Sequence, residues 1–163
     1  MKDLDSLDLL ILEELQNDAR ISTAELGRRI GLSTPATAER VRKMEESETI
    51  LGYHARVQPE KLGLTSQAFV KVIVAGDRLK AFQHLVLAVP EVLECHRVTG
   101  NESFILHVAV ENAAHLERVI DSLMPYVSTN TSMILASPVT WRAIKRPTVG
   151  PKRTRRPNGL SHR

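Results

Sequence analysis

The sequence predicts an α+β protein of two domains, and three observations lead to this prediction. Apolar residues recur at helical spacing through about the first fifty residues, short strand-like runs dominate the second half, and the basic residues are unevenly distributed. We therefore divide the chain of 163 residues into a helical domain at 1–50, a strand-containing linker at 51–64, an α+β domain at 65–144 and a basic tail at 145–163.

The first two predicted helices form the start of the N-terminal domain. The first helix has one apolar face, which is made by Leu4, Leu7, Ile11, Leu15 and Ala19. Ser22 and Glu25 have the S-x-x-E spacing of a capping box, which predicts the start of a second helix. Gly31 is free to take a positive φ and is expected to end that helix.

A third predicted helix follows after a short break. Ser33 or Thr34 is suited to cap it, Pro35 suits its first turn, and we expect it to end near Ser47. The inward face is predicted to contain Thr37, Val41 and Met44. A strand is expected next at 50–57, as the wing of a winged helix-turn-helix domain.

The second half has the pattern of a ferredoxin-like βαββαβ domain, in which two helices cover one face of an antiparallel sheet. Strands are predicted at 67–74, 92–98, 104–110 and 129–135. One helix is predicted at 77–89, and Pro125 is expected to stop another that carries Leu116, Val119, Ile120 and Leu123. The uncovered sheet face is still apolar, so we expect self-association to cover it.

Composition excludes several classes of protein. No apolar run approaches the roughly 18 residues of a membrane span, and the N-terminus lacks the form of a signal peptide, so a cytoplasmic location without membrane contact is expected. Cys95 is the single cysteine and is expected to be a small buried residue. His96 and His107 lie on neighbouring predicted strands, but a zinc site needs more ligands, so we expect no metal. No nucleophile elbow, Walker loop or dinucleotide fingerprint occurs, so we expect no enzyme activity and no cofactor.

Charge is segregated along the chain. Residues 1–50 contain seven Lys and Arg against eleven Asp and Glu, whereas residues 145–163 contain seven basic residues and no acidic one. Within the acidic first domain, five basic residues between Leu26 and Lys43 face a single acid, Glu39. Such a basic stripe favours nucleic-acid binding. The tail is expected to be disordered, either as a solvated extension or as an arm that binds phosphate.

The second and third helices have the layout of a helix-turn-helix unit, whose second helix presents its N-terminal end to the major groove. The residues expected to face the bases are Thr34, Pro35, Ala38, Glu39 and Arg42. Those placed for phosphate contacts are Arg28, Arg29, Ser33, Arg40 and Lys43. The alternative is a three-helix bundle that binds no DNA and whose arginines are merely solvated.

The stretch "RISTAELGRRIGLSTPATAERVRKME", with its flanks, closely resembles the N-terminal domain of the Lrp/AsnC, or feast/famine, transcriptional regulators. "PEVLECHRVTGNESFILHV" resembles their second domain, which is a ferredoxin-like effector and assembly domain. The resemblance covers residues 4–145. The resemblance implies a nucleoid-associated regulator that binds double-stranded DNA sequence-specifically as a homodimer or as a larger assembly such as a tetramer or octamer. An amino acid or related effector is expected to control this binding.

Three residues depart from the family pattern. Thr37 replaces a usual Val, and its hydroxyl is expected to bond to the carbonyl of residue 33. Gly27 replaces a common Ala, at a cost of about 1 kcal/mol in helix propensity, although its small size lets helices approach closely. Glu48 replaces a usual Gly and is expected either to be strained at positive φ or to end the helix differently.

The turn "VTGNESF" is the second candidate site, because the corresponding family turn, close to G-D-Y-D-Y, helps bind an amino acid between dimers. The effector-binding residues implied are Gly100, Asn101, Glu102 and Ser103, with hydroxyls from Thr131 and Ser132. Asn101 and Ser103 replace the two usual acids, so the acceptor for the ammonium group is moved, weakened or lost. A plain hairpin turn is the alternative. Two other functions stay open: an effector-independent architectural DNA-binding protein, and a small-molecule-binding or enzymatic protein whose helical domain serves assembly.

Overall fold

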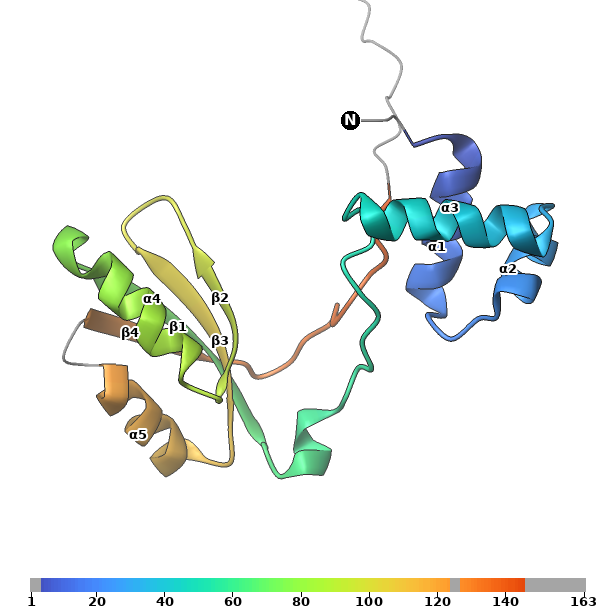
Figure 1. Ribbon diagram of the computed structural model, residues 1–163. Helices are drawn as coiled ribbons and strands as arrows, with labels where there is room; N and C mark the ends of the chain where they lie inside the picture. Colours follow the sequence, from blue (N-terminus) through green and yellow to red (C-terminus); the bar gives the residue numbers. More distant parts are fainter. Residues whose placement is uncertain (1–3, 124–126, 146–163) are drawn as a thin grey trace, which may run out of the picture. The chain divides into compact units, whose positions relative to one another are not determined.

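The computed structural model describes residues 4–123 and 127–145, which belong to two compact units (Figure 1). Among the described residues, the first unit combines residues 4–54 with residues 141–145, and the second lies within Ala55–Thr140. The first unit contains three helices, α1 (Ser6–Asn17), α2 (Thr23–Ile30) and α3 (Thr34–Glu46). Its hydrophobic core is formed by Ile11, Leu26 and Met44, so each helix contributes one buried hydrophobic side chain.

Local hydrogen bonds start each of these helices. Asp5 caps α1 in a complete capping box with Asp8, which we did not predict. The Ser22 hydroxyl accepts from the Glu25 N–H at 3.2 Å, so the predicted start of α2 is confirmed. Only half of that predicted box forms, because the Glu25 carboxylate binds arginines instead of the Ser22 N–H.

The turn between α2 and α3 has the predicted geometry. Gly31 lies at φ +76°, in the left-handed region that favours glycine, and ends α2. The Leu32 N–H donates to the Gly27 carbonyl at 2.9 Å, which closes the turn. Ser33 is the cap of α3, where its hydroxyl accepts from the Ala36 N–H at 3.4 Å. These contacts fix the direction in which α3 leaves the turn.

The C-terminus of α3 is a Schellman motif with a glutamate at the glycine position. The Thr49 N–H donates to the Met44 carbonyl at 2.8 Å, and the Glu48 N–H donates to the Glu45 carbonyl at 3.0 Å. These are the two backbone hydrogen bonds that define the motif. Glu48 lies at φ +56°, where a side chain is unfavourable. The first of the two outcomes expected for Glu48, a strained left-handed residue, is therefore the one observed.

Replacing Glu48 by Gly is expected to stabilise the first unit by about 0.5–1 kcal/mol, because the removal of left-handed strain exceeds the added entropy of the unfolded chain. Denaturant unfolding followed by the fluorescence of Trp141, the only tryptophan, measures this free energy. Glu46→Gly is the matched control, since Glu46 lies within α3 and its loss is expected to destabilise by about 1 kcal/mol. A lower stability for Glu48→Gly would contradict the assignment of strain.

The strand predicted at 50–57 is not formed in the structure, so the predicted wing is wrong for this chain. A strand exists only as part of a hydrogen-bonded ladder, and this segment pairs with no other strand among the described residues. Side-chain bonds hold the segment instead: the Arg56 guanidinium donates to the Thr140 carbonyl at 3.1 Å, and the Tyr53 hydroxyl donates to Glu45 at 2.9 Å. A short 3₁₀ helix, Pro59–Leu62, follows within the second unit.

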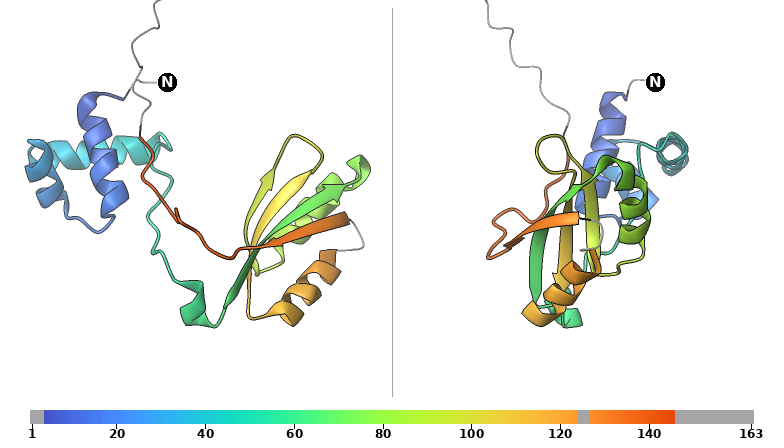
Figure 2. Two further views of the ribbon diagram at one scale, coloured as in Figure 1. Left: turned by 180° about the vertical axis from the view of Figure 1, so that it is seen from behind. Right: turned by 90° about the vertical axis from the view of Figure 1, so that its left-hand side faces the viewer.

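The second unit is the predicted βαββαβ domain. Its elements are β1 (Ser66–Val74), a 3₁₀ turn (Gly76–Arg78), α4 (Leu79–Leu87), β2 (Val92–Arg97), β3 (Phe104–Val110), α5 (Ala113–Leu123) and β4 (Val127–Met133). The four strands pair antiparallel in the order β2-β3-β1-β4. Both helices cover one face of the sheet, as the views in Figures 1 and 2 show. The ferredoxin-like fold is therefore confirmed.

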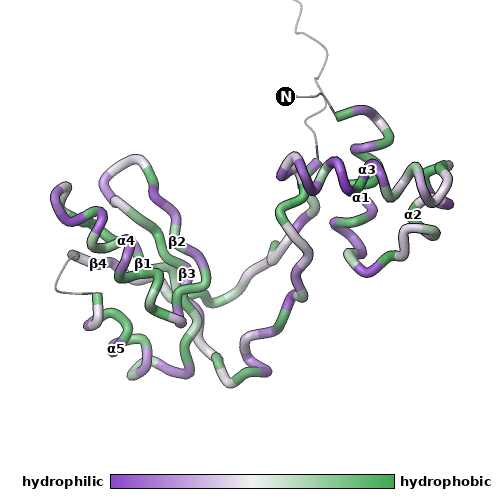
Figure 3. Tube along the Cα trace, in the orientation of Figure 1, coloured by the Kyte–Doolittle hydropathy of each residue, from purple (hydrophilic) through white to green (hydrophobic). Residues whose placement is uncertain are grey.

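The core of this unit lies between the helices and the two central strands. Val70, Val72, Leu106 and Val108 are completely buried, and so is Phe82 of α4. Hydrophobic residues accordingly run along β1 and β3 in Figure 3, whereas α3 of the first unit is mostly hydrophilic. Alternation along β1 and β3 places the remaining side chains on the opposite face of the sheet.

That opposite face is apolar and is not covered by either helix. Phe69 and Ile73 of β1 are 42% and 51% exposed. The Phe69 ring packs against His107 with a centroid distance of 5.2 Å, and the His107 ring bonds to the Gln67 amide at 3.0 Å. The structure thus contains the apolar sheet face that we predicted.

The second unit contains the single cysteine and the two histidines considered as metal ligands. Cys95 is exposed, contrary to prediction, because β2 is an edge strand that pairs only with β3. Partial burial nevertheless raises the pKa of its thiol. His96 bonds to Glu94 at 3.3 Å, and no cluster of three metal-ligating side chains occurs within residues 4–123 and 127–145.

The expected helix stop at Pro125 and the expected disorder of the tail after Lys145 lie outside the described residues. In the part of the chain that is described, every helix is too short or too polar to cross a membrane.

Candidate DNA-binding surface and effector turn

The third helix separates an inner from an outer face as predicted. Thr37 and Met44 are 0% and 3% exposed, and Val41 is half-buried beside them. The residues predicted to face the bases are all exposed, namely Thr34, Pro35, Ala38, Glu39 and Arg42. The N-terminal half of α3 therefore presents a continuous polar and small-residue surface to solvent.

Thr37 is accommodated in the core by a hydrogen bond within its own helix. Its hydroxyl donates to the Ser33 carbonyl at 3.0 Å, as the sequence led us to expect. Gly27 of α2 lies directly against this residue: a Cβ on Gly27 would be 2.8 Å from the Thr37 hydroxyl oxygen and 2.7 Å from the Leu32 carbonyl oxygen. The two departures from the family pattern therefore meet at a single contact between α2 and the turn into α3.

The cations on the outer face of α3 are bound to carboxylates of the same helix. Arg42 donates to both Glu39 oxygens at 2.8 and 3.0 Å and also pairs with Glu46, while the Lys43 ammonium lies 3.1 Å from Glu39. These bonds, first from Arg42 and then from Lys43, lower the pKa of Glu39 to about 2. Glu39 is thus ionised at neutral pH and holds two cations in place.

The cations at the end of α2 are bound in a similar way. Arg28 forms a bidentate pair with Glu25 at 2.7 Å, and Arg29 contacts Glu25 at 2.9 Å and Glu14 of α1 at 2.7 Å. The two arginines lower the pKa of Glu25 to about 2. Both side chains remain exposed, with Arg28 at 74% and Arg29 at 43%.

Arg40 differs from the other predicted phosphate ligands. It lies on the flank of α3, where its side chain is 30% exposed and donates to Asp5 at 2.8 Å and Asp8 at 2.6 Å. The Asp8 backbone N–H and then Arg40 lower the pKa of the Asp5 carboxyl. Arg40 therefore joins α3 to the N-terminal cap of α1. The structure does not place it with the exposed arginines.

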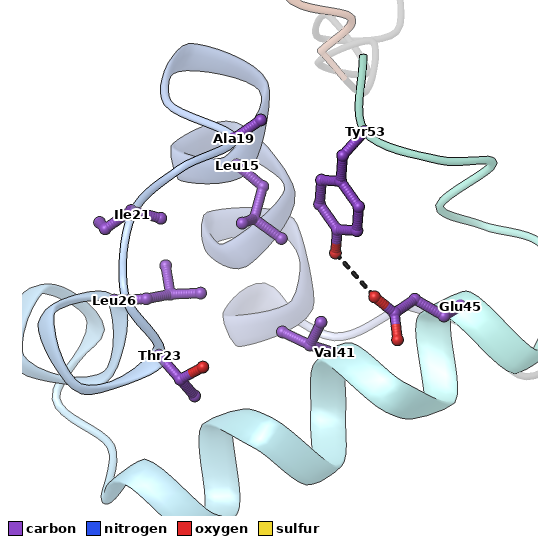
Figure 4. Close-up of a pocket in the computed structure, with 8 residues that line it drawn as sticks. All are labelled: Leu15, Ala19, Ile21, Thr23, Leu26, Val41, Glu45 and Tyr53. Atoms are coloured by element: carbon purple, nitrogen blue, oxygen red, sulfur yellow. Dashed lines mark hydrogen bonds between the residues drawn. The ribbon is translucent and has the colours of Figure 1, made fainter. Parts of the chain in front are cut away.

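A small cavity lies between α1, α2 and α3, and Tyr53 lies at its edge (Figure 4). Its lining combines apolar side chains, among them Leu15, Ile21 and Val41, with polar groups. The Tyr53 hydroxyl donates to Glu45 of α3 at 2.9 Å. Burial, followed by the bond to Glu45 and its charge, raises the pKa of Tyr53 to about 12. This contact ties the chain that leaves α3 back onto that helix.

Tyr53 is expected to titrate near pH 12 when measured by phenolate absorbance after a rapid pH jump in a Tyr126→Phe background, which leaves it the only tyrosine. Because the folded-state pKa is raised, the associated stability is complete below about pH 10 and is lost as the pH rises toward 12. Glu45→Gln should lower this pKa, since it removes a charge that disfavours the phenolate. Titration near pH 10 in the folded protein would contradict the contact.

The turn predicted to bind an effector connects β2 to β3. Gly100 lies at φ +119° and Asn101 is exposed at the tip. Glu102 is half-buried, and its carboxylate is joined by no hydrogen bond or ion pair to another residue in the described part of the chain. Ser103 behaves differently: its hydroxyl accepts from the Val74 N–H at 3.0 Å and donates to the Val74 carbonyl at 3.3 Å. Ser103 thus fastens the turn to β1.

The two hydroxyls predicted on the last strand lie away from this turn within one chain. Thr131 and Ser132 pair with Val70 and Phe69, whereas Ser103 lies beside Val72 and Val74. The offset is about three residues, or roughly 10 Å along the strand, and β1 lies between the two strands. Ser128 pairs with Ile73 and is closer to the turn. Sequence reasoning missed it because the register of β4 is not visible in the sequence.

Comparison with known proteins agrees with this arrangement. Residues 4–45 match the AsnC-type helix-turn-helix domain and residues 67–144 match the Lrp/AsnC ligand binding domain. The HTH-type transcriptional regulator LrpC of Bacillus subtilis is 35% identical over 133 residues, which cover 82% of this chain and 92% of LrpC. The Leucine-responsive regulatory protein of Klebsiella pneumoniae is 37% identical over 122 residues, which cover 73% of this chain and 74% of that protein.

Solved structures show the same fold in both domains. The structure of B. subtilis LrpC has a TM-score of 0.82 at 34% identity and covers 85% of this chain and 99% of its own. A transcriptional regulator from Neisseria meningitidis, solved as an L-Met complex, has a TM-score of 0.82 at 28% identity and covers 87% of this chain and 96% of its own. With both domains matched in order and the helix-turn-helix geometry in place, the chain belongs to the Lrp/AsnC family of transcriptional regulators.

Proposed function

We propose that this protein regulates transcription by binding a specific double-stranded DNA sequence through α3, under the control of an amino acid or related small molecule. The observation that carries the proposal is the outer face of α3, which exposes small, apolar and cationic groups. Thr37 and Met44 are buried on the opposite face and fix α3 in the domain. A helix of this kind fits the major groove with its N-terminal end toward base edges. As a DNA-binding protein it is expected to act in the cytoplasm, on the nucleoid.

Each exposed residue of α3 suits a particular contact in the major groove. The Arg42 guanidinium matches the two acceptors of guanine, and Pro35 and Ala38 offer apolar contact for thymine methyl groups. The Glu39 carboxylate is suited to accept from the amino group of cytosine, and the Thr34 hydroxyl suits more than one base. These side chains together form the proposed reading surface.

Phosphate contacts are proposed for Arg28, Arg29, Ser33 and Lys43 around this surface. Arg28 and Arg29 are exposed at the end of α2, and Lys43 is 59% exposed on α3. Arg40 is bound to Asp5 and Asp8, so we propose that it mainly supports α3 from behind. Its predicted phosphate contact requires release from those carboxylates and stays a prediction.

The carboxylates that hold these cations have a role in selectivity. Exposed ion pairs contribute little to stability, so a phosphate or base competes with Glu39 and Glu25 at small cost. A non-specific DNA site offers phosphate alone, while the operator also offers partners for Glu39 itself. We therefore propose that Glu39 weakens non-specific binding more than operator binding.

For the effector we propose the β2–β3 turn. The backbone at Gly100 permits close approach to a carboxylate, and Glu102 supplies an acidic acceptor for an ammonium group, with Asn101 beside it. The Leucine-responsive and L-Met-bound relatives support an amino acid as the class of ligand. Thr131 and Ser132 reach such a ligand only if another copy of the chain brings its β4 to the turn.

Self-association is proposed through the open face of the sheet. Phe69 and Ile73 expose apolar surface there, and a second copy of the same face covers it in a symmetric dimer. A dimer also presents two copies of α3 to half-sites about one helical turn apart, which predicts a pseudo-palindromic operator. Tetramers or octamers would extend this arrangement along the DNA.

Selection of bound duplexes from a random pool, repeated with and without a mixture of amino acids, tests the function directly. We expect enrichment of a pseudo-palindromic sequence and a change in binding when the effector is present. Enrichment of no sequence, with binding that depends only on salt, would contradict sequence-specific regulation.

Replacing Glu102 by Gln is expected to raise the effector concentration needed for a half-maximal response by at least about tenfold. The side chain keeps its shape but loses the charge that accepts from the ammonium group. DNA binding without effector should not change. Fluorescence anisotropy of the selected operator, titrated with single amino acids, measures both quantities. Glu94→Gln is the control, since Glu94 is an exposed acid on β2 outside the turn. An unchanged effector concentration would show that Glu102 is not the acceptor.

A second candidate function is an effector-independent architectural protein that coats or bends DNA. The observation that favours it is Ser103, which replaces an acid that is common in the family at this position. Its hydroxyl is hydrogen-bonded to the Val74 backbone and is therefore not free to bind an effector. In that case no amino acid changes binding, and the specificity ratio between operator and random duplex is small.

A further inference from the structure

The chain passes between the two units twice. It leaves the first unit after His54 and returns to it at Trp141, so two segments of chain connect the helical domain to the sheet domain. The returning segment is fastened just before it leaves the second unit, where the Thr140 carbonyl accepts a hydrogen bond from the Arg56 guanidinium at 3.1 Å. This bond joins the two connections to each other.

Gln16 of α1 holds the returning segment on the first unit. Its amide nitrogen donates to the Ile144 carbonyl at 3.1 Å, and the Ile144 N–H donates to its side-chain oxygen at 2.8 Å. The same amide nitrogen donates to the Leu12 carbonyl at 3.1 Å, so both of its N–H groups have acceptors and the side chain is held in one orientation. The Lys145 ammonium adds an ion pair with Glu13 of α1 at 2.5 Å. We call the paired bonds between Gln16 and Ile144 the clasp.

The clasp holds backbone and is suited to open. The Ile144 side chain is 85% exposed, so it contributes little packing against α1. Exposed hydrogen bonds and ion pairs contribute little net stability, because water replaces them readily. The buried core of Ile11, Leu26 and Met44 does not depend on these bonds. The first unit therefore has two states, with the returning segment either held on α1 or released from it.

We propose that the clasp determines which spacings between two half-sites of an operator the protein accepts. This inference rests on the proposed function, in which a dimer places two copies of α3 on the DNA. Two sites bind simultaneously only where the connection between them permits it. With the clasp closed, two connections restrict the first unit, so a displaced half-site is reached poorly. With the clasp open, one connection remains and more spacings are accepted. Gln16 is thus a residue that determines specificity through the position of α3.

Trypsin cleavage after Arg142 tests whether the clasp forms in solution. A protease acts on chain that has locally opened, so a held segment is cut slowly, and Gln16→Ala should raise the cleavage rate by at least about fivefold. The substitution keeps α1 folded, because Ala favours helix at least as well as Gln. Asn17→Ala is the matched control, since the Asn17 amide donates only within α1, to the Glu13 carbonyl at 2.9 Å. Equal cleavage rates in the unaltered protein and in Gln16→Ala would overturn the clasp.

Operators with two base pairs added between the half-sites test the effect on spacing. The insertion rotates one half-site by about 70° about the DNA axis. We expect the unaltered protein to lose at least about tenfold in affinity, and Gln16→Ala to lose about threefold or less. Gln16→Glu keeps the acceptor for the Ile144 N–H but loses the donor to the Ile144 carbonyl, so its loss should be intermediate.

The outcomes separate this inference from the proposed function. If the proteins prefer the operator to random duplex but the insertion weakens the unaltered protein and Gln16→Ala equally, the inference alone is wrong. If the unaltered protein binds operator and random duplex equally, the proposed function is wrong and the spacing inference fails with it. In that case the cleavage rates after Arg142 still show whether the clasp exists.

Discussion

Replacing Arg42 by Ala is expected to weaken binding to the selected operator by about 5- to 150-fold, because a bidentate contact between arginine and a base contributes about 1–3 kcal/mol. Arg42 is 53% exposed on the outer face of α3, and Glu39 and Glu46 hold its guanidinium in the unbound protein. A pre-oriented guanidinium loses little freedom when it meets a base. The substitution should also relax the preference at one base pair of each half-site, which a repeated selection with the variant measures.

Two other substitutions separate base reading from phosphate binding. Arg28→Ala removes an exposed cation at the end of α2, so it should weaken operator and random duplex about equally and reduce the salt slope by about 1. Glu39→Gln releases Lys43 and loosens Arg42, so it should strengthen binding to random duplex and lower the specificity ratio. If Arg42→Ala affected both duplexes equally and kept the base preference, Arg42 would be a phosphate ligand and the proposed reading surface would be misplaced.

The helices of the first unit were predictable because their signals are local. Ser22, Gly31 and Ser33 act through hydrogen bonds or backbone angles within a few residues, and each lies where its spacing placed it. The inner face of α3 also follows from the helical period, including the Thr37 hydroxyl bond to the residue four positions earlier. The two helices and four strands of the second unit follow similarly from their apolar periodicity.

The ionic contacts were not predictable, because they join residues far apart in the chain. Asp5 and Asp8 bind Arg40 across more than thirty positions, and Glu14 binds Arg29 across fifteen. A count of charges between Leu26 and Lys43 included Arg40 in the basic stripe and omitted Glu25 and Glu46. Only the packing of α1 against α3 shows that this arginine is held on the flank.

The linker and the effector turn show a second limit of sequence reasoning. A strand at 50–57 was expected from composition, but a strand also needs a partner, which composition does not reveal. In the turn, the residue types suggested a binding site, and the sheet register decided which of them are available. The Ser103 hydroxyl is hydrogen-bonded to the Val74 backbone, and β1 separates Thr131 from the turn.

Replacing Gly27 by Ala is expected to lower the free energy of unfolding, although the same substitution stabilises most helices. In a helix without a close neighbour, Gly→Ala stabilises by about 1 kcal/mol. Here the new Cβ would lie 2.7 Å from the Leu32 carbonyl oxygen, a backbone atom of the turn into α3. We therefore expect a net loss of about 1–3 kcal/mol in unfolding free energy, since the turn must move to make room. Unfolding by denaturant, followed by Trp141 fluorescence, measures it.

The loss should extend to DNA binding, because the turn determines how α3 projects from α2. Ala24→Gly is the control for helix propensity, since Ala24 is exposed on the same helix and its replacement should cost about 1 kcal/mol without affecting the turn. Adding Thr37→Ala to Gly27→Ala removes the other close atom, at 2.8 Å, and should restore only part of the stability, because the Leu32 carbonyl stays in place. A gain of stability for Gly27→Ala alone would mean that α2 and the turn are further apart than this contact requires, and that Thr37 is accommodated independently of Gly27.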